Sequence, residues 1–118
     1  SFIASHILCA RYYLATYLGS EKKFPCEDQL GSMDSIEEAK NILPIKEIIK
    51  YWMEISNILD DKFATVHELY VYRESKFHFP VDDDTILGGT AFLLQHESYH
   101  IGQIALIRKS LGLPAMKY

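Results

Sequence analysis

Residues 44–66, PIKEIIKYWMEISNILDDKFATV, decide the fold class, because their apolar side chains recur at the spacing of an amphipathic helix. The apolar stripe of this segment consists of Ile45, Ile48, Ile49, Trp52, Ile55, Leu59 and Phe63. Charged and polar residues occupy the opposite side. Pro44 suits the first helical position, where a missing N–H is no loss. The segment therefore predicts one long helix with a buried face and a solvated face.

Two further helices are predicted near the ends of the sequence. Apolar spacing indicates a helix over residues 2–18, and a last helix over residues 86–111 or 89–111. Gly19 and Gly112 follow these helices, as expected for a residue that ends a helix in the left-handed conformation. Together the three segments predict an all-α protein, because nothing in the chain alternates strand with helix as a parallel sheet requires.

The connecting segments are polar and short. Residues 20–31 are charged and predict a loop, and residues 35–38 match the S-x-x-E capping box of a short helix that ends at Leu43. Alternating aromatic residues over 69–79 predict a small irregular hairpin. Three acids, 82–84, precede the last helix. We interpret them as partners of its free amides and positive end rather than as a cation site.

Composition narrows the class of protein. The 118 residues fit one domain, and 12 basic against 16 acidic side chains give a net charge of −4, which argues against a basic nucleic-acid scaffold. No apolar run approaches the roughly 20 residues of a membrane span, and the first residues lack a signal-peptide layout, so we expect a cytoplasmic protein without a membrane partner. Cys9 and Cys26 are too few for a disulfide framework, and we expect both to be reduced.

The segment His96-Glu-Ser-Tyr-His100 carries the strongest chemical signal. Positions four apart project from one face of a helix, so both imidazoles point the same way. Apolar side chains share that arc and predict that the pair faces the core: Phe92, Leu93, Ile104, Ile107 and Leu111. A lone inward histidine is usually bonded to the backbone, but two within one turn need several partners, which a shared metal ion supplies. Chance pairing and metal binding remain about equal alternatives from this pair alone.

The same five residues match the H-E-x-x-H string of zinc proteases, in which Glu97 would be the general base. That class needs a third ligand downstream, and the residues after His100 include no Glu, Asp or His. The extended motif also fails, because Leu106 stands where its last histidine belongs. Glu97 points away from the pair, toward the flank of Arg108. We therefore interpret Glu97 as a surface residue or a support for a ligand.

A third ligand must then come from upstream. His6 lies on the helix face shared by Phe2 and Tyr13, which makes it a second inward imidazole and our choice. His67 falls near the end of the long helix, where a cation suits the C-terminal dipole, so we expect a structural role for it. His78 lies between two phenylalanines in a loop and is a possible substrate contact.

His6 followed by ARYYLATYLG at 10–19, together with HESYHIGQIALIRKSLGLP at 96–114, resembles the DinB-like (YfiT-like) superfamily of metal-binding four-helix bundles. The family pattern has one histidine early in the second helix and H-x-x-x-H in the last, continued by G-Q-I, an Arg and Gly-x-Pro. The matching positions here are His6, His96, His100, Gly102-Gln103-Ile104, Arg108 and Gly112-Leu113-Pro114.

The resemblance implies an up-down-down-up bundle in which a helix precedes the one that carries the first histidine. Because the sequence starts five residues before His6, we expect residues 1–118 to form a single, N-terminally incomplete DinB-like domain. The implied ligands are His6, His96 and His100. Imidazoles of this kind accept zinc, nickel, iron or manganese, and three of them leave a position open for chemistry.

Characterised members of the family imply two activities: transfer of a low-molecular-weight thiol, or metal-dependent hydrolysis of a small molecule. Gln103 and Tyr13 share the ligand faces and could orient an imidazole, contact a substrate or bond between helices. The alternative is a non-catalytic, metal-stabilised bundle that acts as a dimeric interaction or stress-associated protein. An apolar patch of Leu94, Ile101 and Ala105 would suit a homodimer.

Overall fold

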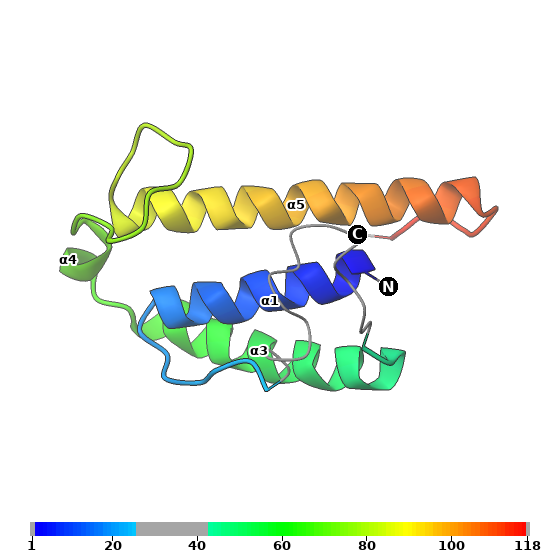
Figure 1. Cartoon of the computed structure of the whole chain (residues 1–118), viewed down its shortest axis with the longest axis horizontal. Coiled ribbons are helices and arrows are strands. Elements are labelled where there is room, and N and C mark those ends of the chain that lie inside the picture. The colour runs from blue at the N-terminus through cyan, green and yellow to red at the C-terminus, as the bar shows by residue number, and fades with distance from the viewer. Residues whose placement is uncertain (1, 26–42, 118) are drawn as a thin grey trace.

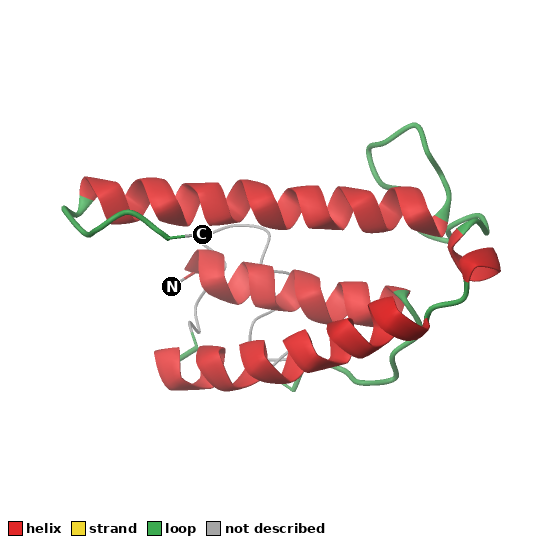
Figure 2. Ribbon diagram, turned by 180° about the vertical axis from the view of Figure 1, so that it is seen from behind, coloured by secondary structure: helices red, strands yellow, loops and turns green. Residues whose placement is uncertain are grey.

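The computed structural model describes residues 2–25 and 43–117, which form three long helices and one short one (Figure 1). They are α1 (Phe2–Tyr17), α3 (Ile45–Thr65), α4 (Glu68–Val71) and α5 (Ile86–Ser110). Helix α1 packs against both α3 and α5. The colours of Figure 1 show that α1 and α3 run in the same direction and α5 in the opposite one, and Figure 2 shows the same order from behind. The all-α prediction is confirmed for these residues.

The predicted helix ends hold to within one residue. Gly19 and Gly112 follow α1 and α5 with φ angles of +96° and +72°, the conformation that glycine adopts without strain. Pro44 is the N-cap residue of α3 rather than its first helical residue, so the helix begins at Ile45, one residue later than predicted. Thr85 caps α5, and its Oγ1 accepts a hydrogen bond from the Gly88 amide at 3.2 Å.

The carboxylate of Asp83 holds the capping residue Thr85 in place. Its Oδ1 accepts from the hydroxyl of Thr85 at 2.6 Å and from the Thr85 amide at 2.9 Å. These two hydrogen bonds, the hydroxyl first, lower the pKa of Asp83 because they stabilise its charged form. The capping role that we predicted for the acids is thus shared between a threonine and one carboxylate.

The predicted hairpin over 69–79 is wrong. Residues 68–71 form helix α4, whose first turn is capped by His67 through a hydrogen bond from the Leu69 amide to Nδ1 at 3.1 Å. The hydroxyl of Tyr70 donates to the carbonyl oxygen of Tyr17 at 3.1 Å, which holds α4 against the end of α1. This tertiary contact outweighs the strand preference of the aromatic residues.

The chain does reverse its direction, but over residues 74–85 rather than 69–79. One antiparallel bridge joins Glu74 to Thr85, with a hydrogen bond from the Ser75 amide to the Asp84 carbonyl at 2.7 Å. A single bridge closes the loop between α4 and α5 at its base and brings the start of α5 beside the end of α1.

Several predictions concern residues outside the described ranges. The capping box at 35–38, the short helix that ends at Leu43 and the thiol of Cys26 lie outside the described residues. Cys9 is partly buried on α1. Within the described ranges, none of the helices combines the length and apolar character that crossing a membrane requires.

The core fills the space between α1 and its two neighbours. Its members are Leu8, Tyr12, Leu14, Ala15, Tyr17, Leu18, Phe24, Leu43, Ile48, Ile55, Leu59, Ile86 and Leu93. Only part of the predicted stripe on α3 is covered, since Ile45 and Ile49 are 65% and 54% exposed. Helix α1 contacts one flank of α3 and leaves these two side chains beyond its reach.

Only some of the side chains on the predicted inward face of α5 are buried. Leu93 is buried, but Ile107 and Leu111 are exposed, because the last turns of α5 extend past the beginning of α1 (Figure 1). His96 and His100 are half-buried between α1 and α5 rather than in the core. That position leaves their ring nitrogens able to meet groups from α1.

Gly89 permits the close approach of α1, the loop and α5. A Cβ atom there would collide with the hydroxyl of Tyr17 and with the ring of Phe79. The Tyr17 hydroxyl cannot easily move, because it is buried and donates to Ser75 Oγ at 2.8 Å.

We expect Gly89→Ala to lower the free energy of unfolding by about 1–3 kcal/mol, the usual cost of overpacking. Urea denaturation followed by circular dichroism measures the change. Gly102→Ala is the matched control on the same helix, because a Cβ at Gly102 meets nothing within 4 Å. The control should be neutral or slightly stabilising. Equal stability of the two variants would contradict the packing described here.

Candidate metal centre

Three imidazoles from two helices converge on one point. His6 lies on α1, and His96 and His100 lie one turn apart on α5. The Nε2 atom of His96 is 3.2 Å from Nε2 of His6 and 3.1 Å from Nε2 of His100. One nitrogen from each ring lies within 4.8 Å of the other two, a grouping that could hold a metal ion. The structure therefore brings together the three histidines that the sequence indicated.

Hydrogen bonds alone do not account well for the close approach of these three ring nitrogens. A neutral imidazole nitrogen either donates one proton or offers one lone pair, yet Nε2 of His96 meets two other nitrogens. A zinc ion about 2.0–2.1 Å from each nitrogen would hold them about 3.3–3.4 Å apart in a tetrahedron and about 2.9 Å apart at right angles. The two separations that involve His96 fall between these values, as expected for neighbouring ligands of one divalent ion, and the three histidines together could hold such an ion.

Gln103 contacts the ring of His100 on the side away from the other two histidines. Its Oε1 lies 2.7 Å from His100 Nδ1, and its Nε2 donates to the hydroxyl of Tyr99 at 3.2 Å. An amide oxygen only accepts, so in this contact a neutral His100 would carry its proton on Nδ1 and turn the lone pair of Nε2 toward the other rings. Of the roles weighed for Gln103, the contact with a ligand imidazole is the one that the geometry supplies.

The surroundings of His96 favour its neutral form. Burial is the first cause of its lowered pKa, and repulsion from His100 and His6 is the next, while Glu97 partly opposes them. Its Nδ1 is buried and has no hydrogen-bond partner in the described part of the chain. A ring that stays neutral keeps the lone pair that metal binding requires.

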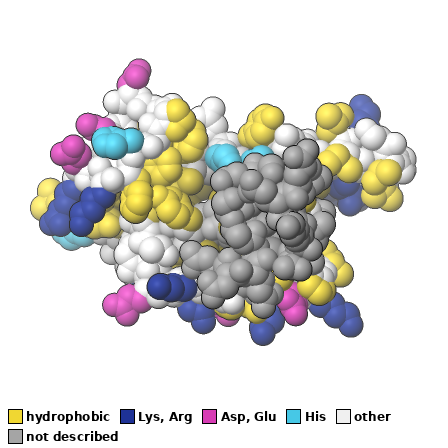
Figure 3. Space-filling model, in the orientation of Figure 1, with side chains coloured by type: hydrophobic (Ala, Val, Ile, Leu, Met, Phe, Trp, Pro, Cys, Tyr) yellow, Lys and Arg dark blue, Asp and Glu magenta, His cyan; other side chains and the backbone are white. Residues whose placement is uncertain are grey.

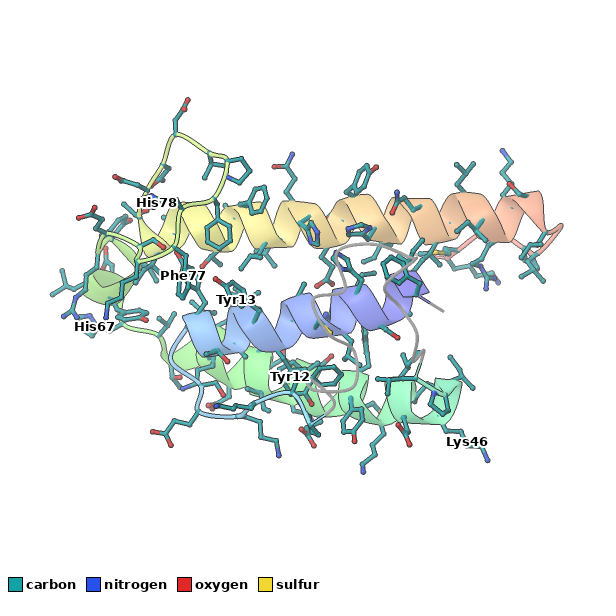
Figure 4. The ribbon with its side chains drawn as sticks, viewed as in Figure 1. Tyr12, Tyr13, Lys46, His67, Phe77 and His78 are labelled. Carbon is teal, nitrogen blue, oxygen red and sulfur yellow. The ribbon has the colours of Figure 1, made fainter. Side chains whose placement is uncertain are left out.

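His67 and His78 stand apart from this group. Both are exposed, and Figure 4 places them at the α4 end of the molecule. His67 caps α4, so its structural role is confirmed, although it accepts from an amide at a helix beginning rather than serving as a cation at a helix end. His78 lies in the loop before α5.

Tyr13 contacts other aromatic rings rather than the imidazoles, although a contact with an imidazole was one of the roles weighed for it. Among the described residues its ring contacts are with Tyr17, Phe77 and Phe79, at centroid separations of 5.7–6.4 Å. Burial first, and Tyr17 next, raise the pKa of its hydroxyl. Tyr13 shares the helix face of His6 but lies two turns away, and the loop before α5 supplies its neighbours.

Arg11 and Glu97 form an ion pair next to the histidines, which we did not predict from the sequence. Both carboxylate oxygens of Glu97 accept from Arg11 on α1, from Nε at 2.9 Å and from Nη2 at 2.6 Å. The two side chains are only 18% and 16% exposed. Glu97 does turn away from the ligands, but its partner is Arg11, whereas Arg108 donates to the Pro114 carbonyl at 3.0 Å. This engagement supports a structural role for Glu97 rather than that of a general base.

Arg11 also connects both helices to α3. Its Nη1 donates to Ser56 Oγ at 2.8 Å, and its guanidinium carbon lies 3.9 Å from the centre of the Trp52 ring. One side chain thus fixes the relative positions of all three long helices. The only sequence signal for this role was that Arg11 is the single Lys, Arg, Asp or Glu residue of the first helix.

No protein-family model, curated protein or solved structure matches the chain. The residues of the chain are therefore the basis for the function proposed below.

Arg11→Met and Glu97→Gln should each destabilise the protein, and a double-mutant cycle should give a coupling of about 1–2 kcal/mol, because the pair is bidentate and largely shielded. Lys22→Met tests a matched exposed pair, since Lys22 lies 3.5 Å from Glu54 and is 51% exposed. We expect a change below about 0.5 kcal/mol there. A coupling near zero between Arg11 and Glu97 would show that the ion pair does not hold α1 to α5.

Acidification should destabilise the metal-free protein. The pKa of His96 is lower in the folded state than its ordinary 6.5, so below that pH the unfolded chain binds a proton that the folded chain does not. Stability contributed by neutral His96 is present above pH 6.5 and declines as the pH falls toward the lowered value. Urea midpoints in EDTA between pH 7.5 and 5.5 measure this decline. His96→Gln should show a flatter profile, and identical profiles would exclude His96 as the cause.

Proposed function

We propose that the chain binds one divalent metal ion through Nε2 of His6, His96 and His100 and uses it to transfer a low-molecular-weight thiol or to hydrolyse a small molecule. The observation that carries the proposal is the convergence of three imidazole nitrogens from α1 and α5 within 4.8 Å. Three nitrogen ligands leave at least one position open, as catalytic sites do.

Zinc, nickel, iron and manganese all suit these ligands. A divalent ion in such a centre acts as a Lewis acid that makes water or a thiol ionise near neutral pH. The other contributions come from the chain. Gln103 keeps the His100 lone pair on Nε2, burial keeps His96 neutral, and the Arg11–Glu97 ion pair holds the helices that carry the ligands.

The helix directions support the resemblance to DinB-like bundles. Parallel α1 and α3 followed by antiparallel α5 agree with the last three helices of an up-down-down-up order (Figure 1). The position of His6 early in α1 and of the histidine pair in the middle of α5 agrees with the family pattern. A DinB-like metalloenzyme is therefore our preferred interpretation.

A non-catalytic bundle is the second candidate, because an ion bound by His6 and the histidine pair would link α1 to α5 as a structural staple. Leu94 is 44% exposed, and Ile101 and Ala105 are partly exposed, so the patch that we expected to suit a homodimer lies at the surface. Dimer formation, a cytoplasmic location and the lack of a nucleic-acid partner stay predictions.

Protein purified without a polyhistidine tag should bind one equivalent of zinc or cobalt in equilibrium dialysis. Alanine at His6, His96 or His100 should weaken binding at least about 100-fold, and Gln103→Leu about 10-fold, as is usual for a group that orients a ligand. His67→Ala and His78→Ala are the matched controls and should bind as the wild type does. Equal affinity of the His100→Ala and His78→Ala variants would overturn the proposed site.

Turnover separates the two candidate functions. Metal-loaded wild type incubated with a low-molecular-weight thiol and an electrophile should form the adduct faster than His100→Ala does. Metal binding that raises the melting temperature without accelerating adduct formation or ester hydrolysis would favour the structural staple.

A further inference from the structure

A row of aromatic side chains leads away from His96 toward the loop before α5. Phe92 lies one turn before His96, with ring centroids 6.3 Å apart and ring planes 31° apart. Phe79 follows at 5.3 Å from Phe92, and Tyr13 at 6.3 Å from Phe79. Phe77 completes the row, 5.7 Å from Tyr13. We call these four residues, Tyr13, Phe77, Phe79 and Phe92, the aromatic strip.

The strip and the histidines share one side of the α1–α5 pair. Tyr13 is seven residues after His6, and Phe92 is four before His96, so each pair lies on one helix face. Figure 4 shows Tyr13 of α1 next to Phe77 of the loop. The strip is therefore continuous with the candidate metal centre.

The loop that supplies Phe77 and Phe79 is held in place. Ser75 Oγ donates to the Phe77 carbonyl at 2.8 Å and accepts from the Phe77 amide at 3.1 Å. The same Oγ accepts from the buried hydroxyl of Tyr17 at 2.8 Å. A fixed loop presents its rings without the cost of ordering them when a ligand binds.

All four rings of the strip are at least partly open to solvent. Phe77 is 52% and Tyr13 38% exposed, and Phe79 and Phe92 are partly exposed. In Figure 3 hydrophobic side chains gather below the loop before α5, on the side of the histidines near the middle of the view. Exposed aromatic faces next to a polar centre are typical of ligand sites.

We infer that the aromatic strip binds the aromatic ring of a small molecule whose thiolate, carboxylate or hydroxamate group reaches an ion held by the three histidines. This inference rests on the proposed function and names the substrate class of the same site. Phe92 is the strip residue nearest the histidines, with its ring centroid 6.3 Å from that of His96, so a ring joined to a metal-bound group by a short linker would meet Phe92 first. Edge-to-face and offset ring contacts stabilise such a complex beyond the area that it buries.

The experiment uses cobalt-loaded protein and two probes, acetohydroxamate and benzohydroxamate, with dissociation constants measured from the visible cobalt spectrum. The measured preference for the aryl probe is the dissociation constant of acetohydroxamate divided by that of benzohydroxamate. Phe92→Leu should reduce this preference about threefold to tenfold, the size of one aromatic pair contact, whereas Tyr13→Leu, at a position two turns from His6, should leave the preference for this short probe unchanged. Their affinity for acetohydroxamate should stay that of the wild type.

Two variants serve as controls. Tyr13→Phe keeps the ring and should keep the preference, and Phe63→Leu removes a ring on α3 that is 45% exposed and should also leave it unchanged. An unchanged preference in Phe92→Leu would overturn the inference while leaving the metal centre intact. Failure of cobalt to bind the wild type would overturn the proposed function, and this inference with it.

Discussion

The register of α1 against α5 is the constraint on which the candidate centre depends. One imidazole comes from α1 and two from α5, so a shift of a single residue along either helix would separate their nitrogens. The Arg11–Glu97 ion pair fixes this register, with Glu97 next to His96 and Arg11 less than two turns from His6. Because Arg11 also bonds Ser56 and covers Trp52, the third long helix takes part in the same constraint.

Patterns within a single segment could be predicted from the sequence. The spacing of apolar residues located the three long helices, and Gly19 and Gly112 marked two of their ends. The four-residue spacing of His96 and His100 fixed their common face, and the helix face of His6 indicated a third imidazole on the same side. Each of these features follows from local geometry, which repeats along the chain and needs no knowledge of neighbours.

Features that depend on which elements meet were harder to predict. The helical wheel showed that Glu97 turns away from the histidines, but it could not show that Arg11 faces it across 86 residues of sequence. Strand preference misled us at 69–79, where the bond from Tyr70 to the Tyr17 carbonyl favours a helical turn. The buried stripe on α3 was overestimated for the same reason, because its width depends on how many helices cover it.

The position of Trp52 gives the molecule a built-in optical reporter. It is the single tryptophan of the chain, and the Arg11 guanidinium lies over its ring. A cation that close to an indole alters the energy of the excited state, so any displacement of Arg11 changes the emission. Arg11 is joined through Glu97 to the part of α5 beside His96. The indole therefore senses strain between the two helices that carry the imidazoles, without a label and without a second indole to obscure the signal.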